Sequence, residues 1–226
     1  MKINIENKIS EKIPKLSEKF LRDEFINIIL KYKIESNSYD DDFTLEQDLE
    51  KKILSENSFL ESVINSILLA KKEHSDRKIV ILFDIDETIA ANTYVTDTTT
   101  KTFIRPSIPT LFTFLKQEGV QIGLLSSRSE IQSQLDDSNN LQSIQSYITP
   151  EFILSTRNTL SEIKGRELSN KYNDKMFAIG DFEKINFLEE FINKNPDLIV
   201  IPVDDLEYPK LFDYGVALSP QEKFFI

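Results

Sequence analysis

Residues 79–88 have the sequence IVILFDIDET, in which five apolar residues are followed at once by acids and a threonine. An unbroken apolar run of this length predicts a strand that is buried on both faces, as in parallel sheets. Asp84 and Asp86 then stand at the C-terminal end of that strand. Because ligand sites of open α/β sheets lie beyond these strand ends, this stretch indicates both the fold class and the position of a candidate site.

The same pattern recurs along residues 76–226, where strand-length apolar runs alternate with helix-compatible stretches. The runs are 79–83, 120–125, 152–154, 176–179 and 198–201, and the predicted helices are 109–118, 130–145, 160–172 and 182–193. This alternation predicts a Rossmann-like α/β core with a parallel sheet. Residues 1–75 instead carry apolar residues at three- and four-residue steps, which predicts an N-terminal helical region with a polar loop at 36–42 and a capping box at 44–47.

Composition excludes several classes of protein. The chain has 226 residues, 27 basic and 38 acidic, and therefore a formal charge of −11, which disfavours nucleic acid and anionic membranes as partners. It has no Cys and a single His, His74, so disulfide scaffolds, thiolate sites and multi-His zinc sites are excluded. With no apolar run of about 18 residues and no apolar N-terminal core, we expect a cytoplasmic protein.

Acids at two predicted strand ends suggest a metal site. Asp84 and Asp86 are separated by one residue, and Asp181 closes the run 176–180. Like charges about 4 Å apart repel by roughly 4 kcal/mol at an effective dielectric near 20. A hard divalent cation, Mg²⁺, would relieve this repulsion, since it binds carboxylate, water and phosphate oxygens. The alternative is that these Asp residues are turn or cap residues. Asp204 and Asp205 form another possible acid pair, which we interpret as a strand-end turn.

Groups that could bind a phosphate follow the second predicted strand. Ser126 and Ser127 offer a hydroxyl and a free backbone N–H to a phosphoryl oxygen, although a helix N-cap explains them equally well. Arg128 is a candidate substrate contact or a surface ion pair. Lys164 is our candidate for the cation that offsets the charge of a transferring phosphoryl group, since that transfer needs a cation besides the metal.

These residues resemble the four motifs of the haloacid dehalogenase (HAD) superfamily in their order along the chain: residues 84–88, Ser126, Lys164 and residues 180–181. Residues 79–190 more closely resemble class C acid phosphatases and plant vegetative storage proteins, through residues 83–88 with Asn92 and Tyr94, and through residues 108–130. The resemblance implies a phosphatase, since dehalogenases lack the second Asp and P-type ATPases carry Thr at that position.

The resemblance also implies a role for each matching residue. Asp84 would attack phosphorus and form an aspartyl-phosphate. Asp86 would protonate the leaving oxygen and then deprotonate the water that hydrolyses the intermediate. Mg²⁺ would be held by Asp84, by the Asp86 main-chain carbonyl and by Asp181. Ser126 and Lys164 would bind the transferring group.

The fourth motif departs from the family pattern, because Ile185 and Asn186 stand where relatives carry a second acid. This departure keeps open a catalytically weak or inactive binding or adaptor protein. Residues 89–119 and 155–163 are too few for a folded cap, so we expect a capless core that accepts a phosphorylated small molecule or a phosphoprotein. We expect the N-terminal helices to pack over the core as a partial lid, and the Thr-rich stretch 93–101 is a candidate loop at the entrance.

Overall fold

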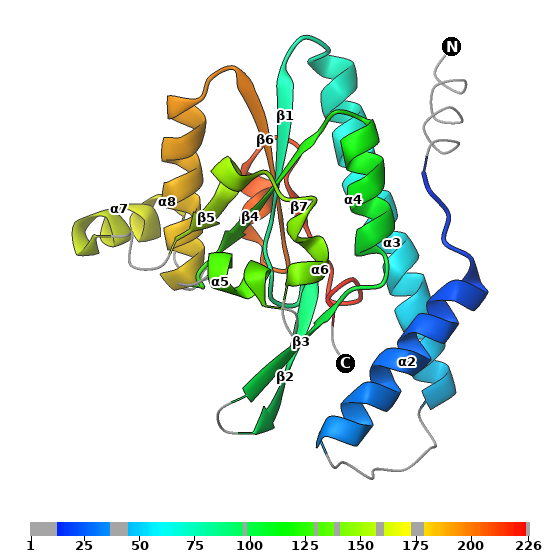
Figure 1. Cartoon of the computed structure of the whole chain (residues 1–226). Coiled ribbons are helices and arrows are strands. Elements are labelled where there is room, and N and C mark those ends of the chain that lie inside the picture. The colour runs from blue at the N-terminus through cyan, green and yellow to red at the C-terminus, as the bar shows by residue number, and fades with distance from the viewer. Residues whose placement is uncertain are drawn as a thin grey trace.

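The computed structural model describes residues 13–36, 45–96, 99–128, 131–137, 141–156, 161–172 and 179–224. Five strands form one parallel sheet in the order β5-β4-β1-β6-β7. They are β1 (Lys78–Phe83), β4 (Gln121–Ser126), β5 (Ile153–Ser155), β6 (Leu198–Asp204) and β7 (Val216–Ala217). The predicted Rossmann-like α/β fold is confirmed (Figure 1).

Helices cover both faces of this sheet (Figure 1). The helices of the described residues are α2 (Glu18–Ser36), α3 (Leu45–Glu73), α4 (Ile108–Gln117), α5 (Ile131–Asp136), α6 (Gln142–Gln145), α7 (Glu162–Tyr172) and α8 (Ile179–Lys194), with 3-10 turns η1 (Pro150–Phe152) and η2 (Tyr208–Leu211). The predicted helix 130–145 is therefore present as two short helices. None of the described helices combines the length and apolarity needed to cross a bilayer.

The side chains of β1 alternate between two apolar cores, as the two-residue period of a strand requires. Ile79, Ile81 and Phe83 pack in the core with α3 and α4, whereas Val80 and Leu82 pack in the core with α7 and α8. All five are at most 4% exposed. Burial of both faces explains why the sequence here is continuously apolar instead of alternating.

Helix α3 belongs to the core of the sheet. The inward-facing apolar residues of its C-terminal half, from Phe59 to Ala70, lie in one hydrophobic cluster with β1, α4 and β4. Its N-terminal half packs instead against α2, around Leu21, Phe25 and Ile53. The predicted helical region 1–75 and the predicted core therefore share packing through α3. The loop predicted at 36–42 falls almost entirely outside the described residues, as does Thr44 of the capping box.

An antiparallel hairpin replaces the loop that we predicted at 93–101. It consists of β2 (Ala90–Thr96) and β3 (Thr99–Ile104), and it projects beyond the C-terminal edge of the parallel sheet (Figure 1). The β-branched Thr and Val residues of this stretch favour strand over loop. A two-stranded hairpin is far smaller than a folded cap domain.

One glycine of the sheet is fixed by close packing. Gly123 lies in the middle of β4, and a Cβ atom built there would lie 2.5 Å from the Cβ of Phe152 and 2.7 Å from a methyl group of Leu82. A side chain at position 123 would therefore push η1 away from the sheet.

Candidate functional site

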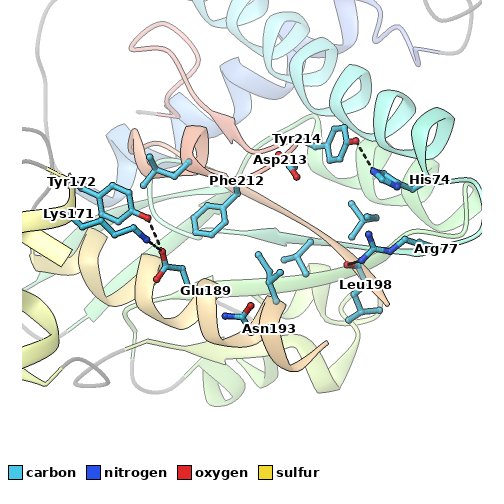
Figure 2. Close-up of a pocket in the computed structure, with 14 residues that line it drawn as sticks. His74, Arg77, Lys171, Tyr172, Glu189, Asn193, Leu198, Phe212, Asp213 and Tyr214 are labelled. Atoms are coloured by element: carbon cyan, nitrogen blue, oxygen red, sulfur yellow. Dashed lines mark hydrogen bonds and ion pairs between the residues drawn. The ribbon is translucent and has the colours of Figure 1, made fainter. Parts of the chain in front are cut away.

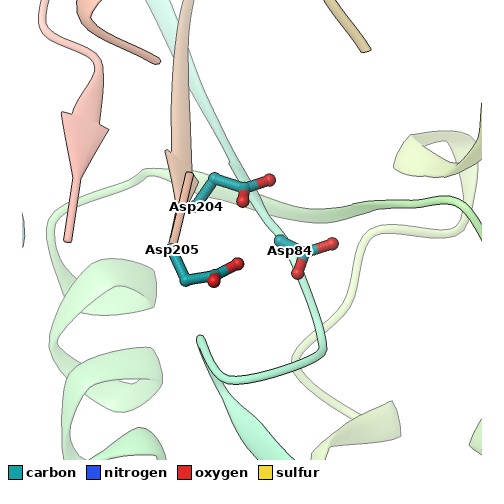
Figure 3. Close-up of side chains that lie close together, drawn as sticks. All are labelled: Asp84, Asp204 and Asp205. Atoms are coloured by element: carbon teal, nitrogen blue, oxygen red, sulfur yellow. The ribbon is translucent and has the colours of Figure 1, made fainter. Parts of the chain in front are cut away.

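Three carboxylates converge at the C-terminal edge of the sheet. Asp84 follows β1, Asp204 ends β6 and Asp205 comes next. One oxygen of each lies within 4.8 Å of the others, and Figure 3 shows the three groups around one space. The pairing of β1 with β6 brings them together, because Phe83 is in register with Val203 and the N–H of Asp84 donates to the carbonyl of Val203 at 2.9 Å.

A buried lysine neutralises part of this acid cluster. The Nζ of Lys184, on α8, donates to Oδ1 of Asp84 at 2.8 Å and to Oδ2 of Asp204 at 2.6 Å. Asp204 also accepts the Tyr208 hydroxyl at 2.7 Å and the Leu206 N–H at 3.0 Å. The carboxylate of Asp204 is thus held on both oxygens, whereas Lys184 bonds Asp84 at Oδ1, so we assign Oδ2 of Asp84 to other ligands.

Burial dominates the electrostatics of this cluster. Burial, followed by the charge of Asp204, raises the pKa of Asp84 to about 8, although Lys184 opposes this shift. Burial likewise raises the pKa of Asp204 against the effect of Lys184. For Lys184 burial lowers the pKa, but the charges of Asp84 and Asp204 outweigh it and keep the ammonium protonated. Burial therefore disfavours the ionised forms of Asp84 and Asp204, and a bound cation would stabilise them.

Asp181 is not among the three carboxylates that converge. In the structure it lies in the first turn of α8 and is 4% exposed. The predicted strand 176–179 lies outside the described residues except for Ile179, which begins α8. Because β1 pairs with β4 on one side and with β6 on the other, the acids beside Asp84 come from the end of β6. Asp204 does bond the turn after β6 through the Leu206 N–H, as the interpretation of a strand-end turn implies, but Asp204 and Asp205 also converge with Asp84.

Lys164 lies near the start of a helix, as predicted, but the structure shows it paired on that helix and not with Asp84. It lies on α7 with its side chain 41% exposed, and its Nζ is 3.5 Å from Glu167 on the same helix. The lysine at Asp84 is Lys184, which the sequence analysis missed. A signal for it was present, because Asp181, Lys184, Ile185 and Leu188 have the i, i+3, i+4, i+7 spacing of a buried helix face, and all four are buried.

Arg128, which follows β4, contacts Asp86. Ser126 is 1% exposed and its Oγ accepts the N–H of Arg128 at 3.3 Å, while Ser127 is exposed. The guanidinium of Arg128 binds both oxygens of Asp86, with Nε to Oδ2 at 3.0 Å and Nη2 to Oδ1 at 2.5 Å. The Asp86 side chain is 47% exposed and lies outside the acid cluster. The structure thus places Asp86 and Arg128 at the rim of the site.

The opposite rim is formed by the chain near its C-terminal end. Lys223 donates to Oδ2 of Asp205 at 2.8 Å, and the N–H of Phe224 donates to the carbonyl of Glu87 at 2.7 Å. Glu87 has a positive φ of 58°, which a non-glycine residue adopts only in a tight turn. Burial and the neighbouring Asp205 raise the pKa of the Glu87 carboxyl. None of these contacts was predicted from the sequence.

The donor set fits a hard divalent cation. Oδ2 of Asp84 and the carboxylate of Asp205 are oxygen ligands of the kind that Mg²⁺ and Ca²⁺ prefer. Asp204 lies beside them but is already bonded by Lys184 and Tyr208. The residues that we assign as candidate metal ligands are therefore Asp84 and Asp205, with Asp204 as their support.

A cavity of about 590 Å³ lies away from the acid cluster, at the start of β6 (Figure 2). His74 and Tyr214 line one side, with Nε2 of His74 3.0 Å from the Tyr214 hydroxyl, and Glu189 lines the other. Arg77 is engaged with the carbonyl of Leu198 at 2.8 Å. The cavity thus has mixed charge and no group aimed at a single ligand type.

Comparison with known proteins adds little to the description of this structure. No family model matches the chain, and no curated protein matches it. Among solved structures, the chain is similar to the class C acid phosphatase from Bacillus anthracis, with a TM-score of 0.36 and 14% sequence identity over 81% of this chain and 85% of that chain. A likeness at this level assigns neither an activity nor equivalent residues.

Proposed function

We propose that the chain is a Mg²⁺-dependent phosphomonoester hydrolase in which Asp84 is the nucleophile. The observation that supports it is the convergence of Asp84, Lys184 and Asp205 at the C-terminal end of the central strand. A carboxylate nucleophile that meets a phosphate needs positive charge close by. Lys184 supplies one such charge at 2.8 Å from Asp84.

The reaction has two steps. In the first, a carboxylate oxygen of Asp84 attacks phosphorus, forming an aspartyl P–O bond while the ester P–O bond breaks and the leaving oxygen takes a proton from Asp86. In the second, Asp86 takes a proton from water, which attacks phosphorus and releases inorganic phosphate from Asp84. Both carboxyl groups return to their starting states.

Other residues of the chain would orient the phosphoryl group. Ser126 lies at the end of β4 beside β1, and its own O–H is a donor for a phosphoryl oxygen. Lys184 takes the role that the sequence analysis gave to Lys164. A Mg²⁺ ion held by Asp84 and Asp205, and by the main-chain carbonyl of Asp86 as the resemblance implies, would neutralise charge on the phosphate.

A second candidate function is a catalytically weak or inactive binding protein, as the sequence analysis left open. The Arg128–Asp86 contact favours it, because the guanidinium occupies both oxygens of Asp86. A leaving oxygen must displace Arg128 before it reaches the proton donor. In this alternative, Asp84 and Asp205 bind a ligand or a cation without turnover.

The test is hydrolysis of a generic aryl phosphate and of a phosphopeptide panel, with and without Mg²⁺. We expect Mg²⁺-dependent turnover that Asp84→Asn lowers at least about a thousandfold. The control is Asp213→Asn, which removes an exposed acid outside the site and should retain full turnover. If the wild type and Asp84→Asn are equally inert on every substrate, the hydrolase is refuted and the binding protein remains.

A further inference from the structure

We propose that a buried ion pair, Arg105–Glu56, is a positioning device that holds both rims of the candidate site in place. The inference rests on the proposed function, because it concerns how the candidate metal ligand Asp205 is oriented. Arg105 follows β3 and Glu56 lies on α3, so neither belongs to the strand ends that carry the acids.

The pair is completely enclosed. The side chain of Arg105 is 0% exposed and that of Glu56 is 1% exposed, and Nε of Arg105 lies 2.6 Å from Oε1 of Glu56. The N–H of Ser107 donates to the other oxygen of Glu56 at 3.1 Å. The guanidinium carbon lies 3.8 Å from the centre of the Phe59 ring. A fully buried ion pair adds little net stability over apolar packing, so its contribution here lies in the geometry it fixes.

The remaining nitrogens of Arg105 bind two main-chain carbonyls. Nη1 donates to the carbonyl of Thr88 at 3.1 Å, four residues after Asp84. Nη2 donates to the carbonyl of Glu222 at 2.7 Å. The planar guanidinium therefore sets the distance between the turn that follows β1 and the C-terminal segment (residues 219–224).

The C-terminal segment transmits this position to the acid cluster. Lys223, next to Glu222, donates to Asp205 at 2.8 Å, and Phe224 donates its N–H to the carbonyl of Glu87 at 2.7 Å. A shift of the Glu222 carbonyl would move both contacts, since they follow within two residues. Arg105 thus reaches Asp205 through Lys223, and the turn after Asp84 through both Thr88 and Glu87.

Helix α3 supports the same segment from a second direction. Oε1 of Glu222 accepts the hydroxyls of Ser58 and Ser62 at 2.7 and 2.9 Å, and Oε2 accepts the N–H of Ser219 at 2.8 Å. Ser58 and Ser62 lie one turn apart from each other on α3, the helix that carries Glu56. The N-terminal helical region, which we predicted to be a partial lid, therefore contacts the C-terminal segment of the site through buried polar side chains of α3.

The test removes both charges together. Glu56→Leu with Arg105→Met avoids an unpaired buried charge and deletes the two bonds to the carbonyls of Thr88 and Glu222. The matched control is Lys71→Met with Glu118→Leu, which deletes a 2.7 Å ion pair of the same helix at the other end of the sheet. Arg105→Lys is a second variant, because it retains a charge for Glu56 but cannot bind both carbonyls at once.

Two measurements decide the outcome. Hydrogen exchange at the Phe224 amide should accelerate at least about tenfold in both Arg105 variants, while the β1 amides keep their wild-type protection. Mn²⁺, used as the metal probe, should bind about 10- to 100-fold more weakly, the usual effect of removing an outer support of a metal ligand, and kcat on the aryl phosphate should fall with KM little changed. The control should match the wild type in each respect.

The proposal is overturned if the Phe224 amide and Mn²⁺ affinity are unchanged. It is also overturned if the β1 amides lose protection to the same extent as Phe224, since that shows a global loss of stability. If the wild type neither binds Mn²⁺ nor hydrolyses phosphate, the proposed function fails separately. In that case the exchange measurement alone decides whether Arg105 positions the C-terminal segment.

Discussion

Replacing Lys184 with Met should destabilise the protein more than any exposed charge change on the same helix. The ammonium lies 2.8 Å from Asp84 and 2.6 Å from Asp204, and all three side chains are at most 6% exposed. Removing one partner of a buried ion pair costs about 3–5 kcal/mol, because the other charge stays buried without compensation. For a chain of this size, each kcal/mol lowers Tm by about 2–4 °C, so we expect a decrease of about 6–20 °C at pH 7.

The loss should shrink as the pH falls. Without the ammonium, the pKa values of Asp84 and Asp204 in the folded state rise further above the unfolded value of about 3.9. An acid with a raised pKa binds its proton more tightly in the folded state, and wild-type Asp84 itself gains its proton as the pH falls through about 8. The loss should therefore be largest above pH 8, where only the variant keeps that proton, and shrink as the pH falls through this value. Urea denaturation on both sides of this pH measures the effect.

Lys194→Met is the matched control, because Lys194 forms an exposed pair with Glu190 at 3.4 Å on the same helix. Such a pair contributes about 0–1 kcal/mol, so this variant should unfold close to the wild-type midpoint at every pH. If Lys184→Met is as stable as Lys194→Met between pH 7 and 8, the buried charge network described here does not exist in solution.

Three further predictions concern the metal and the packing. Burial raises the pKa of Asp84 to about 8, so Mg²⁺ binding should release a proton below pH 8. The Mg²⁺ affinity should then rise by up to about tenfold per pH unit and level off above pH 8. Calorimetry in buffers of different ionisation enthalpy measures the number of protons released. Asp205→Asn should weaken Mg²⁺ binding about 10- to 100-fold, whereas Asp181→Asn should change the affinity by no more than about twofold. If titrations show the larger loss for Asp181→Asn, the metal ligand is Asp181, as predicted from the sequence. Gly123→Ala should lower the free energy of unfolding by about 1–3 kcal/mol, because the new methyl group overlaps the η1 turn. Gly180→Ala has open space in α8 and should raise the free energy of unfolding by about 0.5–1 kcal/mol. Equal urea midpoints for the two variants would contradict this prediction.

Local sequence was enough to predict the central strand and the acid that follows it. The run from Ile79 to Phe83 is apolar because both faces are buried, and Asp84 is the first residue beyond it. Both facts depend only on the consecutive residues 79–88. The end of β4 at Ser126 was predictable for the same reason.

The neighbour of the central strand was not predictable in this way. Residues 176–179 form an apolar run that is followed by Gly180 and Asp181, much as β1 is followed by Asp84. Strand order depends on contacts between distant parts of the chain, and the structure pairs β1 with β6. The acids that meet Asp84 are therefore Asp204 and Asp205, and Asp181 lies in the first turn of α8.

The partners of buried charged residues were also not predictable from the sequence. Lys184 lies on the buried face of α8, between Asp181 and Leu188, but lysine is seldom fully buried unless it is paired. Its partners, Asp84 and Asp204, lie 100 and 20 residues away in sequence. A sequence pattern shows that such a lysine faces inward, but it does not show which carboxylates receive it.

The ammonium of Lys184 has a consequence for the order in which the protein folds and binds its metal. Many small metalloproteins fold only when they acquire their ion, because the free energy of metal binding supplies the free energy of folding. Here an internal cation already bridges Asp84 and Asp204, so the polypeptide can complete its tertiary structure before loading. Removing the metal with a chelator should consequently leave a folded apoprotein that can bind the metal again. The metal concentration would then set the fraction of molecules that hold an ion, but not the fraction that is folded.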